Sequence, residues 1–317
     1  MNNSNTILLL FLSEAPWQYY IQFEQFLHQL QHPFKDQVHV IRDVKRKFPE
    51  AIFKQYKVIA FFYHDPLAAL YPKQYAYAKR LEQFCKENHI HLINRPDPLS
   101  LSSKSSQLKL LRQAGFRVAK TYPLEFTEDI QRIPPNDFPI FIRFDEGHDS
   151  KGGNTKGPFA SYQEAMSNCK LDMFKPGRLL KKPVALQWID TMSPDGLYRK
   201  YRVYATPKQV LKAFIAISPD WYVHWDNTLQ NDMMQQEDQA YIESPVSSEE
   251  HIFFTRVVQA LDLDFCGIDY AYLPSGEIIV WEVNPHPGLE GTEEPIRTRF
   301  TQLLVDYYTD IMKQVSN

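Results

Sequence analysis

The sequence predicts an α/β domain over roughly the first hundred residues, followed by a larger α+β region. Two observations support this division. Strand and helix patterns alternate up to residue 94, as they do in a parallel sheet with helices on its faces. Beyond residue 190, pairs of strand patterns follow one another directly, as the strands of antiparallel hairpins do. The segment 94–98, Asn-Arg-Pro-Asp-Pro, lies between the two regions and is predicted to be a linker.

The first region is expected to contain strands and helices in turn. Strands are predicted at Thr6–Leu12, Val38–Ile41, Val58–Tyr63 and His91–Asn94, with an amphipathic segment from Trp17 to Leu30 and a helix around Gln74–Asn88. All 11 glycines of the chain lie at position 115 or later. A dinucleotide site or a P-loop needs glycines in the first turn between strand and helix, where backbone N–H groups approach phosphate. A nucleotide is therefore expected to bind the second region.

The second region is predicted to open with a helix that begins after the N-cap candidates Ser100–Ser103 and ends before Gly115, a typical residue just beyond a helix. The elements expected after it are a strand at Phe138–Phe144, a polar loop at Asp145–Gly157, a helix opened by the capping box Ser161–Glu164, a strand at Val184–Asp190, a hairpin of Leu197–Ala205 with Val210–Ser218, and helices at Ser248–Leu261 and Glu294–Lys313. The segment Pro219–Val246 shows no clear period.

The most informative segment is a predicted hairpin at 267–284, whose two strands flank a Ser275-Gly276 turn. Centring the hairpin on that turn pairs Asp269 with Glu282 and places Asn284 on the same face, since side chains alternate along a strand. Opposed carboxylates repel each other. A hard cation removes the repulsion, and three oxygen-bearing side chains suit Mg²⁺ on phosphates. An Asp and a Glu in one hairpin are more often a solvated face, but Asn284 favours the metal site.

Composition limits the class of protein. Apolar content of 44% and charged content of 23% are ordinary for a globular protein, and 317 residues suffice for two domains. A net charge of -3 gives no basis for binding nucleic acid or an anionic membrane. The apolar run Ile7–Leu12 is shorter than the roughly 20 residues that span a bilayer, and it lacks the features of a signal peptide. Three distant cysteines argue against a disulfide framework, so a cytoplasmic protein is expected.

These motifs resemble those of ATP-grasp proteins, namely ribosomal-protein glutamate ligases, glutathione synthetases and D-alanine–D-alanine ligases. The resemblance covers roughly residues 90–300. It is carried by Gly267-Ile-Asp269, by Glu282-Val-Asn284-Pro-His-Pro-Gly288, by Lys104–Thr121, and by 195–224, which is similar to an uncharacterised subgroup. The resemblance implies a Rossmann-like pre-ATP-grasp domain at 1–98 and an ATP-grasp domain at 99–317. The latter would comprise a small ATP-binding subdomain, 99–186, and a metal-binding catalytic subdomain, 187–317.

The resemblance also implies roles for individual residues. The ATP phosphates would be contacted by Lys104 and Arg143, and the lid loop over them would contain Gly147, Gly152 and Gly153. Adenine would be held by Gln187, Trp188 and Ile189. Mg²⁺ (with Mn²⁺ as an alternative) would be held by Asp269, Glu282 and Asn284, and Arg202 would neutralise the transferred phosphoryl group. Two positions depart from the family. Arg143 replaces a lysine, which keeps the charge but changes a point donor into a planar fork. Lys200 stands where an acid usually contacts the ribose, so that contact is unassigned.

The implied activity is an ATP- and Mg²⁺-dependent carboxylate–amine ligase that works through an acyl phosphate. A small-molecule kinase on the same fold and a nucleotide-binding regulator without turnover stay open as alternatives. Arg297 and Arg299 are candidates for holding a substrate carboxylate, and His286 is either a substrate contact or a structural residue. The expected partners are a small-molecule or peptide carboxylate and an amine, with no nucleic acid and no membrane. The oligomeric state is open, a homodimer being the commonest soluble assembly.

Overall fold

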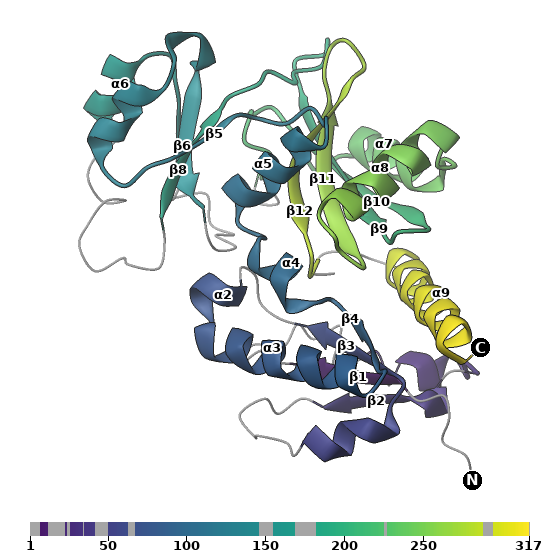
Figure 1. Cartoon of the computed structure of the whole chain (residues 1–317). Coiled ribbons are helices and arrows are strands. Elements are labelled where there is room, and N and C mark those ends of the chain that lie inside the picture. The colour runs from purple at the N-terminus through teal and green to yellow at the C-terminus, as the bar shows by residue number, and fades with distance from the viewer. Residues whose placement is uncertain are drawn as a thin grey trace.

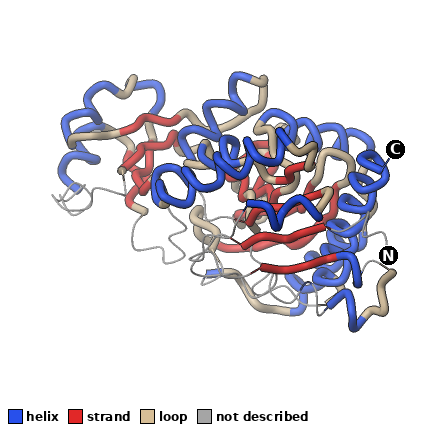
Figure 2. Tube along the Cα trace, turned by 60° about the horizontal axis from the view of Figure 1, so that its bottom comes forward, coloured by secondary structure: helices blue, strands red, loops and turns tan. Residues whose placement is uncertain are grey.

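The computed structural model describes residues 7–11, 23, 26–33, 35–41, 50–62, 67–145, 155–168, 182–224, 227–287 and 294–316. Within these ranges the strands form three four-stranded sheets, each from its own stretch of sequence. Figure 1 shows the first sheet at the bottom, the second at the upper left and the third at the upper right. Figure 2 shows the strands inside the molecule and most helices outside them, the usual way in which layers of secondary structure bury their apolar faces.

The first sheet is parallel and has the strand order β2-β1-β3-β4. Its strands are β1 (Ile7–Phe11), β2 (Val38–Ile41), β3 (Val58–Phe62) and β4 (His91–Ile93), its helices are α2 (Leu67–Leu70) and α3 (Pro72–Glu87), and 3-10 turns lie at Lys35–Gln37 and Glu50–Gln55. The predicted alternation of strand and helix is confirmed. The segment 94–98, predicted as a linker, contains the start of the short helix α4 (Pro96–Ser100), with proline in its first turn, where the missing N–H costs nothing. Its role as a linker stays a prediction.

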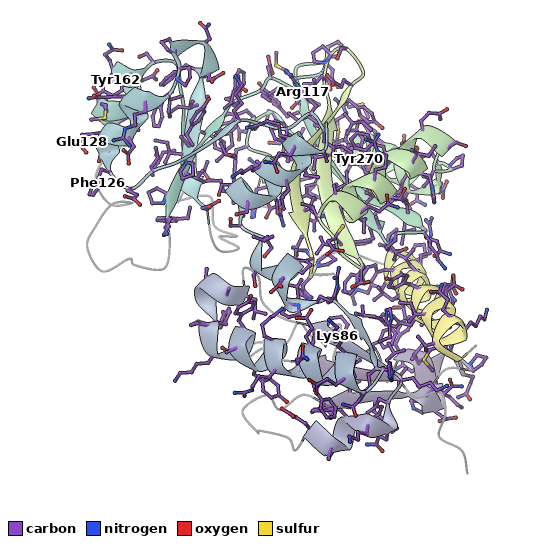
Figure 3. All side chains as sticks on the ribbon, viewed as in Figure 1. Lys86, Arg117, Phe126, Glu128, Tyr162 and Tyr270 are labelled. Carbon is purple, nitrogen blue, oxygen red and sulfur yellow. The ribbon has the colours of Figure 1, made fainter. Side chains whose placement is uncertain are left out.

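The second sheet is antiparallel and has the order β5-β8-β6-β7. It consists of β5 (Thr121–Pro123), β6 (Ile140–Phe144), β7 (Lys156–Phe159) and β8 (Pro183–Gln187), and α6 (Tyr162–Asn168) and 3-10 turns at Thr127–Arg132 and Pro135–Asp137 accompany it. Figure 3 places Phe126, Glu128 and Tyr162 at the outer edge of this part, far from Tyr270 in the third sheet. Helix α5 (Lys104–Gln113) precedes the sheet and has the predicted type of N-cap, Ser103.

The third sheet is also antiparallel, with the order β10-β9-β11-β12. Its strands are β9 (Tyr198–Ala205), β10 (Val210–Ser218), β11 (Cys266–Tyr272) and β12 (Ile278–Asn284), and its helices are α7 (Asp232–Glu243), α8 (Ser248–Ala260) and α9 (Ile296–Ser316). Both predicted hairpins and the helices α8 and α9 are confirmed. Helix α7 lies inside the segment 219–246, where the sequence shows no clear period.

Helix α9 links the first and third sheets through one apolar core. Phe62 of β3, Tyr204 of β9 and Phe300 and Tyr308 of α9 belong to the same buried cluster. The ring centroids of Tyr204 and Phe300 lie 4.5 Å apart, within the range of aromatic pairs. Among the residues described, no helix combines the length and the apolar character that a membrane span requires. The boundaries expected at 98/99 and 186/187 stay predictions.

Candidate functional site

The β11–β12 hairpin sets Asp269 directly opposite Glu282, as the sequence predicts. The predicted two-residue turn is wrong, however. The amide of Leu273 donates to the carbonyl of Glu277 at 2.8 Å, so residues 274–276 form the loop. A register shift follows between Asp269 and Tyr270, where β12 contains an extra residue. The two differences cancel, which is why the carboxylates still face each other.

Arg202 of β9 holds the carboxylate of Asp269. The two residues are paired across β9 and β11, and two parallel bonds join their side chains: Nε to Oδ1 at 2.5 Å and Nη2 to Oδ2 at 2.7 Å. Both side chains are largely buried. Burial alone would lower the pKa of Arg202, but the adjacent Asp269 carboxylate raises it above the ordinary value. Arg202 is therefore a permanent cation on this face of the sheet.

Lys104 of α5 holds the second carboxylate. Its Nζ lies 3.1 Å from Oε1 of Glu282, and 7% of Lys104 is exposed. A lysine in the first turn of a helix opposes the helix dipole. The structure offsets this cost with anions, because Asp145 accepts hydrogen bonds at the same helix terminus from the amide of Ser105 at 2.7 Å and from its hydroxyl at 2.5 Å. Each carboxylate of the hairpin thus has its own cation.

Asn284 lies at the end of β12, opposite Gly267, and therefore on the side of the hairpin that carries the two acids. Its Oδ1 accepts a hydrogen bond from the amide of His286 at 2.9 Å, which orients the side chain. Oxygen-only donors suit Mg²⁺, which is commonly held by one or two carboxylates plus phosphate oxygens. Each of these oxygens has a second lone pair beyond its present partner. The donor set therefore fits a Mg²⁺ ion shared with a nucleotide, and no cluster of three or more His, Cys, Asp or Glu competes with it among the described residues.

The structure locates part of the predicted nucleotide contacts. Arg143 lies on β6 opposite Val184 and is half-buried. The amides of Gln187 and Trp188 donate within the protein, to the carbonyls of Lys120 at 2.9 Å and of Pro139 at 2.8 Å. Ile189 is thus the remaining backbone donor of the three predicted at adenine. Gly147, Gly152 and Gly153 lie outside the described residues.

The residues predicted on the substrate side do not gather in one place. Arg297 is exposed in the first turn of α9. Arg299 donates to the carbonyl of Ile242 at 3.1 Å and lines a shallow cavity beside α8. His286 is 2% exposed, and its ring packs edge-on against Phe62 and Phe265. This packing favours the alternative in which His286 is a structural residue.

Two residues at this site were not predicted. Lys200 lies on the same face of β9 as Arg202, with its Nζ 3.8 Å from Oδ2 of Asp269. Strand alternation could have found it, because the two residues are two positions apart. Gln107 of α5 binds both backbone groups of Val283, donating to its carbonyl at 2.6 Å and accepting from its amide at 3.2 Å. No sequence signal relates two residues 176 positions apart.

Comparisons of the whole chain with known proteins identify its fold. No protein-family model matches the chain, and no curated protein matches it by sequence. Solved structures match it over nearly the whole length. The ATP-grasp ligase PsnB, complexed with a minimal precursor, aligns over 96% of this chain and 99% of its own, with a TM-score of 0.58 and 13% identity.

Two further structures show the same arrangement. The D-cycloserine synthetase DcsG aligns over 95% of this chain and 99% of its own, with a TM-score of 0.60 and 12% identity. The D-alanine–D-alanine ligase from Bacillus anthracis, complexed with ATP, aligns over 98% of this chain and 99% of its own, with a TM-score of 0.58 and 14% identity. The chain therefore has the ATP-grasp fold, as the sequence motifs implied.

Proposed function

We propose that the chain is an ATP- and Mg²⁺-dependent ligase that joins a carboxylate to an amine. The observation that carries the proposal is the pairing of Asp269 with Arg202 and of Glu282 with Lys104 on one face of the β11–β12 hairpin. Two acids and two cations at one site can exchange partners with a charged nucleotide and its metal at little net electrostatic cost. The solved structures of the same fold that are named above are ligases or synthetases.

Each residue has a role in this proposal. Asp269, Glu282 and Asn284 would hold Mg²⁺, which neutralises phosphate charge and orients the transferred group. Lys104, released from Glu282 as the metal is bound, would contact a phosphate oxygen within reach of its side chain. Arg143 would add a second contact from β6, and Arg202 and Lys200 would supply positive charge beside the transferred phosphoryl group.

The proposal implies the following reaction. A substrate carboxylate oxygen attacks the terminal phosphorus of ATP, ADP leaves, and an acyl phosphate forms. An amine then attacks the acyl carbon, the C–O bond to phosphate breaks, and phosphate and a proton leave. Arg202 would stabilise the negative charge in both steps, because it stays charged throughout the physiological range. In this proposal residues 1–98 shape the acceptor side, and 99–186 and 187–317 enclose ATP.

The substrate carboxylate belongs to a small molecule or a peptide. The named relatives point both ways, because PsnB was solved with a precursor peptide and the D-alanine–D-alanine ligase is named for single amino acids. A kinase on this fold would share the nucleotide site. Release of phosphate that depends on both a carboxylate and an amine would mark a ligase, and a stable phosphorylated product would mark a kinase.

A thermal-shift titration with MgATP tests the nucleotide site. Saturating ligand stabilises the folded state by about 2.7 kcal/mol at a hundredfold excess over Kd. We expect a Mg²⁺-dependent rise in the unfolding temperature that Glu282→Gln loses. Glu277→Gln, an exposed substitution of the same kind near the hairpin turn, is the matched control and should keep the shift. A folded wild-type protein that no nucleoside triphosphate stabilises would refute the proposal.

A further inference from the structure

A cavity of about 390 Å³ lies between α7, the edge strand β10 and the start of α9. Its volume falls within the range of small-molecule sites. Its apolar lining includes Phe214, Ile215 and Ile217 of β10. Its polar lining comes from α7, from the residues just before α7, and from Glu294, which precedes α9. The cavity is therefore amphiphilic, with both apolar and polar lining residues.

The charged groups of the lining residues are all acidic. Asp238 and Glu294 line the cavity, and its other polar side chains are amides and a hydroxyl: Thr228, Gln230, Gln235 and Gln239. Among the lining residues that the structure describes, none is Lys, Arg or His. A site with this lining repels anions and attracts a cation with an apolar body.

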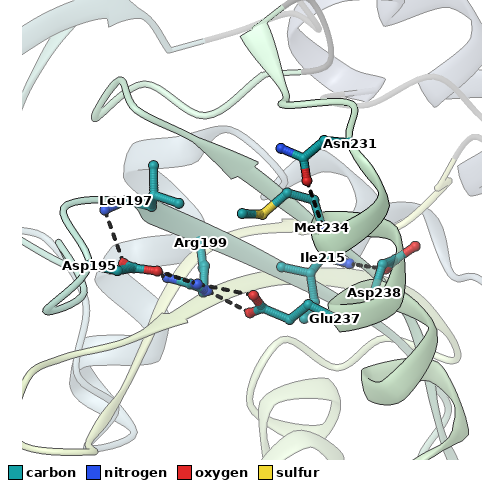
Figure 4. A network of polar contacts seen from close by, with 8 residues as sticks. All are labelled: Asp195, Leu197, Arg199, Ile215, Asn231, Met234, Glu237 and Asp238. Carbon is teal, nitrogen blue, oxygen red and sulfur yellow. Dashed lines mark hydrogen bonds and ion pairs between the residues drawn. The ribbon is translucent and has the colours of Figure 1, made fainter.

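Asp238 is held in place, and no described residue forms an ion pair with it. Its Oδ1 accepts a hydrogen bond from the amide of Ile215 at 2.7 Å, which caps the outer edge of β10 (Figure 4). Burial raises the pKa of Asp238, and the hydrogen bond from Ile215 opposes that rise without cancelling it. A half-buried carboxylate in this situation is stabilised by a cation that enters the pocket.

The helix that carries Asp238 is anchored from two sides. Asn231 caps its first turn through a hydrogen bond from the amide of Met234 at 3.0 Å. Arg199 of β9 bridges Glu237 on α7 and Asp195, with its Nε 2.6 Å from Oε1 of Glu237 (Figure 4). Asp238 is therefore presented by a fixed element, as a recognition group should be.

The cavity adjoins the carboxylate site described above. Phe214 lines the cavity, and the guanidinium carbon of Arg202 lies 5.2 Å from the centre of its ring. Glu294 and Pro295, which also line the cavity, come ten residues after the end of the hairpin strand at Asn284. One aromatic ring thus separates the pocket from the arginine that would face the reacting phosphoryl group.

We propose that this cavity binds the amine substrate, held as an organic ammonium ion by the Asp238 carboxylate with its apolar chain along β10. The proposal deepens the proposed function and rests on it for the fate of the amine. An ammonium ion has no lone pair, so it first gives one proton to the Asp238 carboxylate, and the neutral amine then attacks the acyl carbon. The occupant is a primary amine with an apolar body, because the cavity offers both carboxylate and amide acceptors and aliphatic and aromatic surface. An amino acid with a free carboxylate fits less well, since no lining cation would pair with it.

Ligand-observed NMR titration with n-butylammonium, 1-butanol and butyrate at neutral pH tests the binding. We expect the ammonium to bind at least about tenfold more tightly than either isostere, since hydrogen bonds to a charged partner exceed those to a neutral one. Asp238→Asn should abolish this preference, because it removes the charge but keeps an oxygen for the amide of Ile215. Glu243→Gln, an exposed acid-to-amide change on the same helix, should retain it.

Two results would overturn the proposal. The first is equal binding of the three probes, or a preference that survives in a folded Asp238→Asn protein. The second is amine-dependent phosphate release in which Asp238→Asn leaves the KM for the amine unchanged. This result would leave the ligase proposal intact but would mean that the amine binds elsewhere. Conversely, Asp238-dependent ammonium binding in a protein that MgATP does not stabilise would support the cation site and refute the ligase.

Discussion

At the residue scale, the site consists of two ion pairs, which we propose exchange partners when ligand binds. The two acids assigned to Mg²⁺ are neutralised within the chain, Asp269 by Arg202 and Glu282 by Lys104. Partly buried charges without partners are costly, so these pairs stabilise the site before any ligand arrives. The cations of these pairs compete with a metal ion for the two carboxylates when the metal binds without a nucleotide. When the metal binds together with ATP, the phosphates provide a new partner for the displaced cation, so metal and ATP are expected to bind together.

Lys104→Met tests this competition. Without its cation, Glu282 should bind Mn²⁺ in the absence of nucleotide about tenfold more tightly, measured by the loss of the free-ion electron paramagnetic resonance signal. Affinity for MgATP should fall in the same variant, because a phosphate contact is lost. Lys109→Met, on the exposed side of the same helix, should change neither value. Unaltered Mn²⁺ binding in Lys104→Met would argue against the competition.

At the element scale, prediction from sequence succeeded where a pattern is local. The β9–β10 hairpin has its strands close in sequence, and α8 is a single continuous helical segment, so both were found. Helix α7 was missed because few of its residues face the core: Met234, Tyr241 and Ile242 are the buried ones. The pairing of Asp269 with Glu282 was right although the turn and the bulge were not foreseen.

The contact between α5 and β12 could not be predicted, because it depends on the packing of distant segments. Gln107 makes this contact, and it fixes the backbone between Glu282 and Asn284. Gln107→Leu would leave the amide and carbonyl of Val283 without their side-chain partner. We expect a loss of about 2–4 kcal/mol in the free energy of unfolding, measured with urea, from two buried unsatisfied groups.

The same substitution should weaken MgATP binding, because the two proposed metal ligands Glu282 and Asn284 flank Val283. Gln113→Leu, an exposed substitution of the same type near the end of α5, provides the comparison and should stay within about 0.5 kcal/mol of the wild type. Equal stability of the two variants would mean that Gln107 does not fix the strand.

At the scale of the whole molecule, the first sheet, the third sheet and α9 meet at one carboxylate. Asp264, just before β11, accepts hydrogen bonds from the amide of Asn94 after β4 and from the hydroxyl of Tyr307 on α9, each at 2.6 Å. A shared core extends across the same junction, with Phe62, Phe265 and Phe300 among its members. Residues from three separate regions thus depend on Asp264, which no local sequence pattern singles out.

This junction should make stability depend on pH. Burial raises the pKa of Asp264, and the bonds from Tyr307 and Asn94 oppose the rise without cancelling it. The folded protein then holds the proton more tightly than the unfolded chain does. The protonated Asp264 side chain therefore contributes its full stability below the ordinary pKa range of an aspartic acid, and this contribution is lost as pH rises through the raised pKa.

The Asp264→Asn variant has no titrating group at this position, so its unfolding free energy should lack this loss. Urea titrations of both proteins across the acid range measure the difference between their unfolding free energies. That difference should shift in favour of the variant as pH increases, and a difference that stays constant would show that Asp264 titrates alike in both states.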